Sequence, residues 1–277
     1  MKSDNFIFHL LIVTVLLSLP GVLFSQEKTW KSGYQPLDGQ EGKDVRWFPT
    51  PQELVDKMLD MAKVSPADFL IDLGSGDGRM VITAARRGVR GIGIEYNADL
   101  VELSRKNALK AGVQDKVEFI QADLFEYDFT KGTVITMFLL PEINLRLRPK
   151  LLEMKSGTRI LSTTFTMQTW QHDDIIKIDN KTNKWHTAYL WVVPAKVQGK
   201  WEFKEGELTL VQKFQMVSGK LRNRGKTVEI SGGRLRGNDI TFSAEGAIYT
   251  CRIDKNTMKG TVKKGDKTTD WLAERRQ

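Results

Sequence analysis

Apolar and polar residues follow three different patterns along the chain. Residues 1–25 contain a strongly apolar, uncharged run, FIFHLLIVTVLLSLPGVLF. Residues 47–195 alternate short apolar runs with helically spaced apolar residues, which is typical of an α/β domain. Residues 196–277 alternate apolar and polar positions between Gly or Asn/Asp turns, which predicts antiparallel strands. The polar residues 26–46 show no periodicity and are predicted to be a linker.

The N-terminal run has two interpretations that both involve a membrane. Lys2 precedes the apolar core, Pro20 and Gly21 interrupt it, and Ser25 supplies a small residue for cleavage. These features are typical of a secretory signal peptide. An uncut run of about 20 residues also spans a bilayer. We expect residues 1–25 to export or anchor the protein, on the extracytoplasmic (periplasmic) side in a bacterium. A cytoplasmic orientation stays open.

The α/β region begins with a helix and a β-α-β unit. Apolar spacing predicts a helix over residues 50–62, with Thr50 as its N-cap. A short buried strand over residues 67–73 leads directly into a glycine-rich turn. A helix ending near Gly88 and a second strand over residues 91–96 follow. A glycine-rich first turn in such a unit is typical of nucleotide binding at the carboxyl end of a strand.

The C-terminal region predicts an antiparallel meander that forms a small barrel or sandwich of six to eight strands. Gly237-Asn238-Asp239 is a hairpin signal. The large aromatic residues are expected in its core rather than on a stacking surface; they are Trp201, Phe214, Phe242 and Trp271. The region holds no catalytic constellation, so we expect a docking or stabilising module.

Composition and charge exclude some functions and leave others open. The chain has 277 residues, a single cysteine and three histidines without paired spacing. A disulfide framework is therefore excluded, and no metal site is predicted. Residues 196–277 hold 18 Lys+Arg against 10 Asp+Glu, whereas residues 1–195 balance at 24 each. This basic excess suits acidic lipid, nucleic acid or acidic protein, or is only a soluble surface.

Two acidic residues near the glycine turn indicate which kind of ligand it binds. Asp72 precedes the turn, and Glu95 ends the second strand, where a carboxylate accepts hydrogen bonds from ribose hydroxyls. The glycines let the main chain approach a ligand that a Cβ would push away. Asp72 would repel the diphosphate of a dinucleotide, but it suits a ligand with an ammonium and a sulfonium group. This argues against NAD and for S-adenosylmethionine (SAM).

Three segments, DLGSGDG, GIGIEYN and VEFIQADLFEYDF, resemble the motifs of class I (seven-strand) SAM-dependent methyltransferases. The resemblance implies a Rossmann-like seven-stranded sheet, followed here by the all-β module. It also implies that Asp123 binds the adenine amino group and that Leu124 lies against the adenine ring. The residues expected to bind the cofactor are Asp72, Gly74, Ser75, Gly76, Asp77, Gly78, Glu95, Tyr96, Asn97, Asp123 and Leu124.

The fourth apolar strand ends in LLPE, where base and glutamine methyltransferases of this fold carry an Asn/Asp-Pro-Pro-Tyr/Phe tetrad. The departure disfavours nucleic acid as a partner. LLPE and the segment FPTP at 48–51 resemble the corresponding segments of small membrane-associated protein lysine methyltransferases. This resemblance implies a protein acceptor. The expected substrate pocket comprises Pro49, Thr50, Phe138, Leu140, Pro141 and Glu142. No catalytic residue and no oligomeric state is predicted. A small-molecule methyltransferase and an exported SAM-fold binding protein without turnover are the alternatives.

Overall fold

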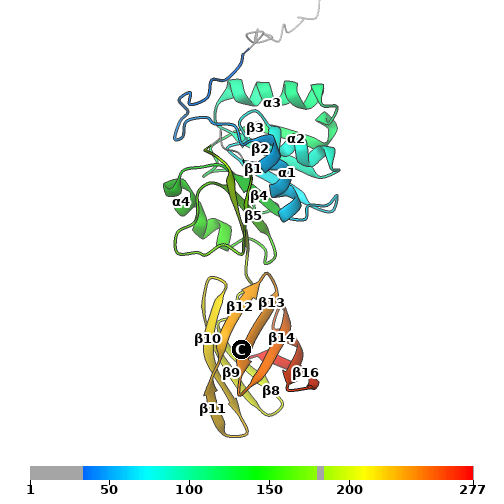
Figure 1. Ribbon diagram of the computed structural model, residues 1–277. Coiled ribbons are helices and arrows are strands. Elements are labelled where there is room, and N and C mark those ends of the chain that lie inside the picture. The colour runs from blue at the N-terminus through cyan, green and yellow to red at the C-terminus, as the bar shows by residue number, and fades with distance from the viewer. Residues whose placement is uncertain (1–33, 180–183, 277) are drawn as a thin grey trace, which may run out of the picture. The chain divides into compact units, whose positions relative to one another are not determined.

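The computed structural model describes residues 34–179 and 184–276. Within them, a seven-stranded mixed sheet with α-helices is followed by a nine-stranded antiparallel sheet (Figure 1). These two features confirm the predicted α/β region and the predicted antiparallel C-terminal region. Residues 1–25, the predicted export or anchor segment, lie outside the described residues. No helix in the described part of the chain is long and apolar enough to cross a bilayer.

The seven-stranded sheet has the strand order β3-β2-β1-β4-β5-β7-β6. Strands β1 to β5 are parallel to one another, and β7 is antiparallel to both β5 and β6. The strands are β1 (Phe69–Leu73), β2 (Arg90–Glu95), β3 (Val117–Gln121), β4 (Val134–Met137), β5 (Arg159–Thr163), β6 (Asp174–Lys177) and β7 (Thr187–Val192). The helices are α1 (Gln52–Met61), α2 (Arg79–Arg86), α3 (Ala98–Lys110) and α4 (Pro141–Leu152), with a 3-10 turn at Gln114–Lys116.

The strand order places a cleft beside the glycine turn. From β1 the chain proceeds through α2 to β2 on one side, whereas β4 pairs with β1 on the other side. The order therefore reverses between β1 and β4. In open sheets of this kind, ligands bind outside the carboxyl ends of the strands at the reversal.

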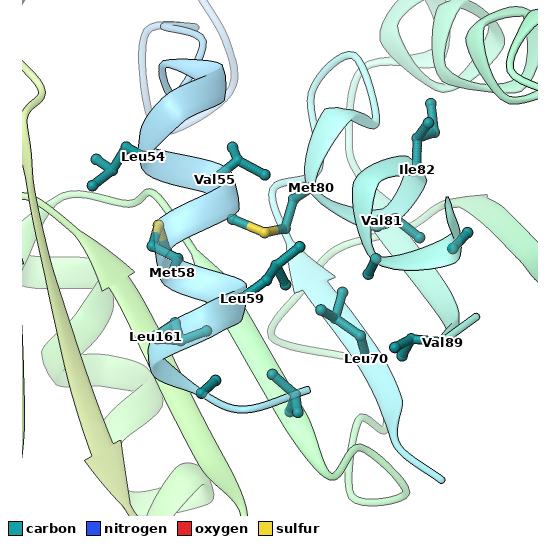
Figure 2. Packing of buried hydrophobic residues seen from close by; sticks show 14 of the residues in the cluster. Leu54, Val55, Met58, Leu59, Leu70, Met80, Val81, Ile82, Val89 and Leu161 are labelled. Atoms are coloured by element: carbon teal, nitrogen blue, oxygen red, sulfur yellow. The ribbon is translucent and has the colours of Figure 1, made fainter. Parts of the chain in front are cut away.

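Helix α1 covers the sheet through one buried apolar face (Figure 2). Leu54, Val55, Met58 and Leu59 have no exposed surface, and they belong to the same cluster as Leu161 of β5. Residues spaced three and four apart share one side of a helix, so the apolar residues of α1 form a single face that packs on the sheet. The packing fixes the start of α1 beside the cleft.

The predicted N-cap of α1 is wrong. The helix begins at Gln52, Pro51 holds the cap position, and no side chain caps the helix. The Thr50 hydroxyl instead lies 3.4 Å from the hydroxyl of Thr163 at the end of β5. A buried hydroxyl needs a polar partner, and the neighbouring strand supplies one here.

The sequence does not predict strand β6, because the acidic pair Asp173-Asp174 is typical of a polar turn. Asp174 is the first residue of β6, which pairs only with β7 and lies at the edge of the sheet. Most of its residues are exposed, so they lack the apolar pattern that identifies a buried strand.

Eight of the nine C-terminal strands close into a barrel, because β10 pairs with both β9 and β12. The short β11 adds only to the far end of β10. The strands are β8 (Gly199–Phe203), β9 (Gly206–Lys213), β10 (Met216–Asn223), β11 (Lys226–Glu229), β12 (Ser231–Arg236), β13 (Asp239–Ala244), β14 (Ala247–Asp254), β15 (Thr257–Lys264) and β16 (Lys267–Arg275). Alternating burial along β14 shows which side chains fill the interior.

Three of the four predicted core aromatics belong to the barrel cluster. Trp201 and Phe242 are buried, and Trp271 packs against them while partly exposed. Phe214 is the exception, because it packs against the cluster of the seven-stranded sheet and stacks on Trp170, with ring centroids 6.0 Å apart. Phe214 lies in the turn between β9 and β10 at φ +57°, outside the strand alternation on which the prediction depended.

Candidate active site

The glycine turn between β1 and α2 requires glycine for both conformation and space. Gly74, Gly76 and Gly78 have φ values of +80°, +54° and +81°. A Cβ on Gly78 would lie 2.7 Å from the Phe119 ring and 2.8 Å from the Ser104 Cβ. Only glycine combines positive φ with so close an approach. The close approach at Gly78 packs the turn against β3 and α3, and Gly74 and Gly76 line the cleft.

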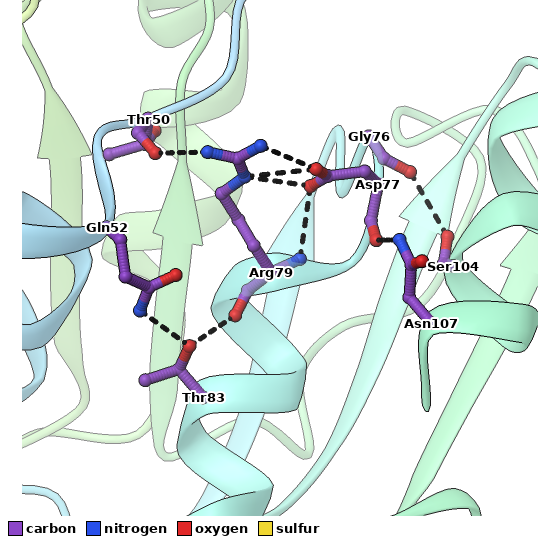
Figure 3. A network of polar contacts seen from close by, with 8 residues as sticks. All are labelled: Thr50, Gln52, Gly76, Asp77, Arg79, Thr83, Ser104 and Asn107. Atoms are coloured by element: carbon purple, nitrogen blue, oxygen red, sulfur yellow. Dashed lines mark hydrogen bonds and ion pairs between the residues drawn. The ribbon is translucent and has the colours of Figure 1, made fainter. Parts of the chain in front are cut away.

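A polar network holds this turn in place (Figure 3). The Arg79 guanidinium donates to both carboxylate oxygens of Asp77, at 2.6–3.1 Å, and to the Thr50 carbonyl at 2.9 Å. On the other side, Asn107 and Ser104 of α3 donate to the carbonyls of Asp77 and Gly76. The turn is thus tied both to the segment before α1 and to α3.

Asp72 is a buried acid at the carboxyl end of β1. It is 7% exposed, and one carboxyl oxygen accepts a 2.6 Å hydrogen bond from the Thr136 hydroxyl. Burial raises the pKa of Asp72 to about 7, against the opposing effect of the Thr136 bond. The charges of Glu95 and Asp77 raise that pKa further. A cation arriving beside Asp72 would favour its ionised form.

Glu95 ends β2 and faces the glycine turn. One carboxylate oxygen accepts the Gly76 N–H and the other accepts the Asn97 N–H, both at 2.9 Å. Asn97 in turn caps α3, where its side chain accepts the Asp99 N–H at 2.9 Å. Each Glu95 oxygen has one protein donor and keeps acceptor capacity for a ligand.

Asp123 is held by a segment that the sequence did not identify as part of the site. Residues 39–48, here called the strap, fold back on themselves through hydrogen bonds between Gly39 and Trp47 and between Trp47 and Gln40. Lys43 of the strap forms a 2.6 Å ion pair with Asp123 and lies 4.4 Å from the centre of the Tyr96 ring. The Lys43 hydrogen bond is the main cause that lowers the pKa of Asp123.

Three aromatic rings gather around a fourth, Trp185, in the same cavity. The four are Phe48, Phe138, Phe165 and Trp185, here called the aromatic box. The Trp185 ring centre lies 5.4 Å from Phe48, 5.3 Å from Phe138 and 6.3 Å from Phe165. The rings come from the strap and from the segments after β4, after β5 and before β7.

These groups line one cavity of about 440 Å³, a size typical of small-ligand sites. Its wall comes from five stretches, within residues 40–50, 72–80, 94–100, 122–124 and 137–143, and from Thr163, Phe165 and Trp185. Every predicted cofactor residue except Gly78 lines it, as do Pro49, Thr50, Phe138 and Leu140 of the predicted substrate pocket. Pro141 and Glu142 begin α4 outside the lining, and Glu142 is exposed.

Sequence reasoning missed the strap, Phe165 and Trp185. Residues 40–46 are polar and aperiodic, which predicts a linker, yet they form part of the cavity wall. Trp185 and Phe165 lie in loops, where no periodic pattern indicates which way a side chain faces. Within residues 34–179 and 184–276, no group of three His, Cys, Asp or Glu side chains comes together as metal ligands.

Comparison with known proteins identifies the family. Residues 72–174 match the model of the ANTKMT methyltransferase domain. A protein-lysine N-methyltransferase of Saccharolobus islandicus is 40% identical over 152 residues, which cover 54% of this chain and 94% of the relative. The chain is a member of the class I SAM-dependent methyltransferases.

Two further methyltransferases resemble this one and differ in their named substrates. The adenine nucleotide translocase lysine N-methyltransferase of Mus musculus is 35% identical over 119 residues, and the match spans 42% of this chain and 52% of the mouse protein. A crystal structure of an RNA methyltransferase from Salinibacter ruber with S-adenosyl-L-homocysteine is 48% identical, with a TM-score of 0.51. The structural match covers 54% of this chain and 96% of the Salinibacter ruber chain. The barrel lies outside the residues matched by the family model.

The acidic hydrogen-bond acceptors of this methyltransferase's cavity suit the cofactor of the family. Among the described residues, Thr136 is the hydrogen-bonding partner of Asp72, and main-chain amides are the partners of Glu95. Neither acid is therefore neutralised by a lysine or arginine ion pair. A cationic ligand that also carries hydroxyl groups can satisfy both acids, whereas a diphosphate would be repelled.

Proposed function

We propose that this enzyme methylates lysine side chains of proteins, using a Rossmann-like class I domain. The observation that carries the proposal is the uncharged aromatic end of the cavity, beside the carboxyl end of β4. The lining residues close to these rings in the sequence are Pro49, Thr50, Leu140, Ile143 and Thr163, and none of them is charged. The Arg79 guanidinium reaches the Thr50 carbonyl and is paired with Asp77. An uncharged end lined by aromatic rings suits an alkyl chain that carries an amine. Relatives named as lysine N-methyltransferases of proteins, the archaeal and the mouse enzymes among them, support this proposal.

In this proposal the cofactor-facing acids divide three tasks. Asp72 accepts from the ammonium group of the amino-acid end, Glu95 from the ribose hydroxyls, and Asp123 from the adenine amino group. SAM supplies an electrophilic methyl group on a positively charged sulfur. The residues of the chain align the acceptor and exclude water, because direct displacement depends mainly on positioning.

The second candidate is RNA, because the Salinibacter ruber structure is described as an RNA methyltransferase. A nucleobase in a protein site stacks on ring faces and is read along its polar edge. The ring pairs of the aromatic box are tilted by 33–68°, so they offer no parallel faces between which a flat base could stack. The polar neighbours Thr50 and Thr163 lie within hydrogen-bonding distance of each other. We therefore favour the lysine.

The test is to incubate the full-length protein and SAM carrying a labelled methyl group with fractionated cell extract. We expect label in protein, and acid hydrolysis should release it as N-methyllysine. Label in nucleosides would select the RNA alternative. Label in small molecules alone would select the small-molecule alternative, and either result would overturn the lysine proposal.

We predict that the methylation rate at saturating SAM rises with pH through at least 8 to 9. A lysine amine has an ordinary pKa of about 10.4 and must lose its proton before it attacks. Desolvation in an apolar pocket favours the neutral amine and brings this pKa down toward the assay range. Initial rates between pH 6 and 10 check the prediction. A rate that is flat or falls between pH 7 and 9 would contradict it.

We predict that Lys43→Met strengthens SAM binding about two- to fivefold at low salt. The Lys43 ammonium holds the carboxylate assigned to adenine, so its removal frees that acceptor. Calorimetric titration at two salt concentrations measures the effect, which should shrink as salt screens the pair. Lys57→Met, which removes an exposed lysine of α1 paired with Glu53, is the matched control. Weaker binding by Lys43→Met would mean that Lys43 holds the ligand instead of competing with it.

We propose, finally, that residues 1–25 deliver the enzyme to a membrane or across it, and that the basic barrel docks an acidic or membrane-bound target. The apolar run and the basic excess of residues 196–277 support this. Mass spectrometry of the mature N-terminus in membrane and soluble fractions tests the first part. An intact, soluble chain that begins at Met1 would contradict it.

A further inference from the structure

The barrel turn between β9 and β10 packs an aromatic ring against the α/β domain. Phe214, in this turn, stacks on Trp170 with the two ring planes 18° apart. The guanidinium of Arg148 on α4 lies 5.4 Å from the centre of the Phe214 ring, a distance at which a ring face attracts a cation. One barrel residue therefore contacts both α4 and the segment that joins β5 to β6.

The backbone of this turn adopts a conformation that phenylalanine disfavours. Phe214 has φ +57°, a region that residues other than glycine rarely occupy. The next residue, Gln215, is 1% exposed, and its side chain donates a 2.6 Å hydrogen bond to the Gln171 carbonyl. The Gln215 carbonyl accepts the Leu235 N–H of β12 at 2.7 Å. A residue that costs energy in a turn where glycine would not indicates that its ring serves a purpose outside the turn.

A buried ion pair holds the same segment from a second strand of the barrel. Asp173 lies just before β6, and its side chain has no exposed surface. One carboxylate oxygen accepts from Arg234 of β12 at 2.7 Å, and the other accepts from the Val192 N–H of β7 at 2.8 Å. Because a buried charge without its counter-ion is costly, this pair keeps the end of the segment against the barrel.

The other end of this segment forms part of the cavity wall. Residues 164–173, here called the β5–β6 loop, include Phe165 of the aromatic box. Arg148 donates to the Met167 carbonyl at 3.1 Å, and Asn144, one helical turn earlier on α4, donates to the Phe165 carbonyl at 3.4 Å. Contacts therefore lead from the barrel turn, through α4 and the loop, to the cavity wall.

We propose that the barrel positions one wall of the acceptor site, because it holds the β5–β6 loop and so keeps Phe165 in place. Its positioning residues are Phe214, Gln215 and Arg234. This inference rests on the proposed function, since it takes the aromatic end of the cavity as the acceptor site. The acids assigned to the cofactor follow β1, β2 and β3, which lie on the other side of β4 from the loop. Loosening the loop should therefore impair use of the acceptor and spare SAM binding.

The test removes the Phe214 ring from the full-length protein without straining the turn that carries it. Phe214→Gly suits the turn, because glycine adopts φ +57° without steric cost. Phe214→Tyr keeps the ring. Arg224→Gly is the matched control, because Arg224 has φ +49° in the turn between β10 and β11 and its ion-pair partner, Glu205, also belongs to the barrel.

Hydrogen exchange followed by mass spectrometry measures how firmly the loop is held, and it needs no acceptor. We expect Phe214→Gly to speed exchange of residues 164–173 about tenfold, through loss of the ring stack and the cation–ring contact. Phe214→Tyr and Arg224→Gly should match the wild type. Unchanged exchange in the loop, or an equal rise throughout the barrel strands, would overturn the proposal.

The second measurement separates use of the acceptor from binding of the cofactor. With limiting cell extract, labelled methyl transfer to the protein fraction should be about tenfold slower for Phe214→Gly, while calorimetric SAM affinity stays within about twofold of the wild type. Undiminished transfer, or an equal loss of SAM affinity, would overturn the proposal. Absence of transfer to protein by the wild type would instead overturn lysine as the acceptor, and hydrogen exchange would still decide whether the barrel holds the loop.

Discussion

Asp72→Asn should weaken SAM binding at pH 8 by at least about 100-fold. The change removes a buried negative charge beside the expected ammonium group while it keeps the size of the side chain. In the wild type, affinity should rise with pH through about 7, because burial raises the pKa of Asp72 to about 7 and the protonated acid cannot pair with a cation. Calorimetry between pH 5.5 and 8.5 measures both effects.

The same substitution should stabilise the fold in the absence of cofactor. An ordinary aspartate in the unfolded chain has a pKa near 3.8, so folding raises that pKa to about 7. The folded state then binds more protons, and stability is lost as pH rises from about 4 through 7. Asp72→Asn removes this loss and should gain on the order of 2–4 kcal/mol in denaturant unfolding at pH 8.

Asp115→Asn, on the exposed 3-10 turn, is the control for removing one carboxylate. It should leave SAM affinity and the stability at pH 8 unchanged. If Asp72→Asn binds SAM as tightly as the wild type, Asp72 does not contact the cationic end of the cofactor. An unchanged stability at pH 8 would show that burial does not penalise its charge.

Glu95→Ala should weaken SAM binding by about 1.5–3 kcal/mol, the range for hydrogen bonds to a charged group. Part of the loss should come from the turn itself, because the Gly76 and Asn97 amides lose their acceptor. Glu95→Gln keeps one acceptor oxygen and should lose less. Titration of the three proteins at pH 8 measures the order. Equal affinities would mean that Glu95 is not the ribose acceptor.

The β1–turn–α2–β2 unit could be predicted because its signals are local. A buried run, glycines at positive φ and an acid at the end of a strand each require particular residue types at fixed spacing. The placement of Asp72, Glu95 and Asp123 along one cavity then follows from parallel strands whose carboxyl ends share an edge.

The features that the sequence did not predict depend on contacts between residues far apart in the chain. Lys43 reaches Asp123 across 80 residues, and a polar, aperiodic segment carries no sign that it will fold back over a cleft. Threonine is a residue type common at N-caps, but the Thr50 hydroxyl lies beside the buried hydroxyl of Thr163 on β5 instead. Phe214 fits a strand pattern by sequence, but it lies in a turn and packs against Trp170.

A crystal structure of the full-length protein with S-adenosylhomocysteine and a lysine peptide tests the central claim most directly. We predict adenine at Asp123 with Lys43 displaced, the ribose on Glu95 and the amino-acid end at Asp72. The sulfur should open toward the aromatic box, with the lysine side chain lying among its rings. A ligand bound outside this cavity, or a lysine side chain that approaches the sulfur without touching the box, would contradict the account.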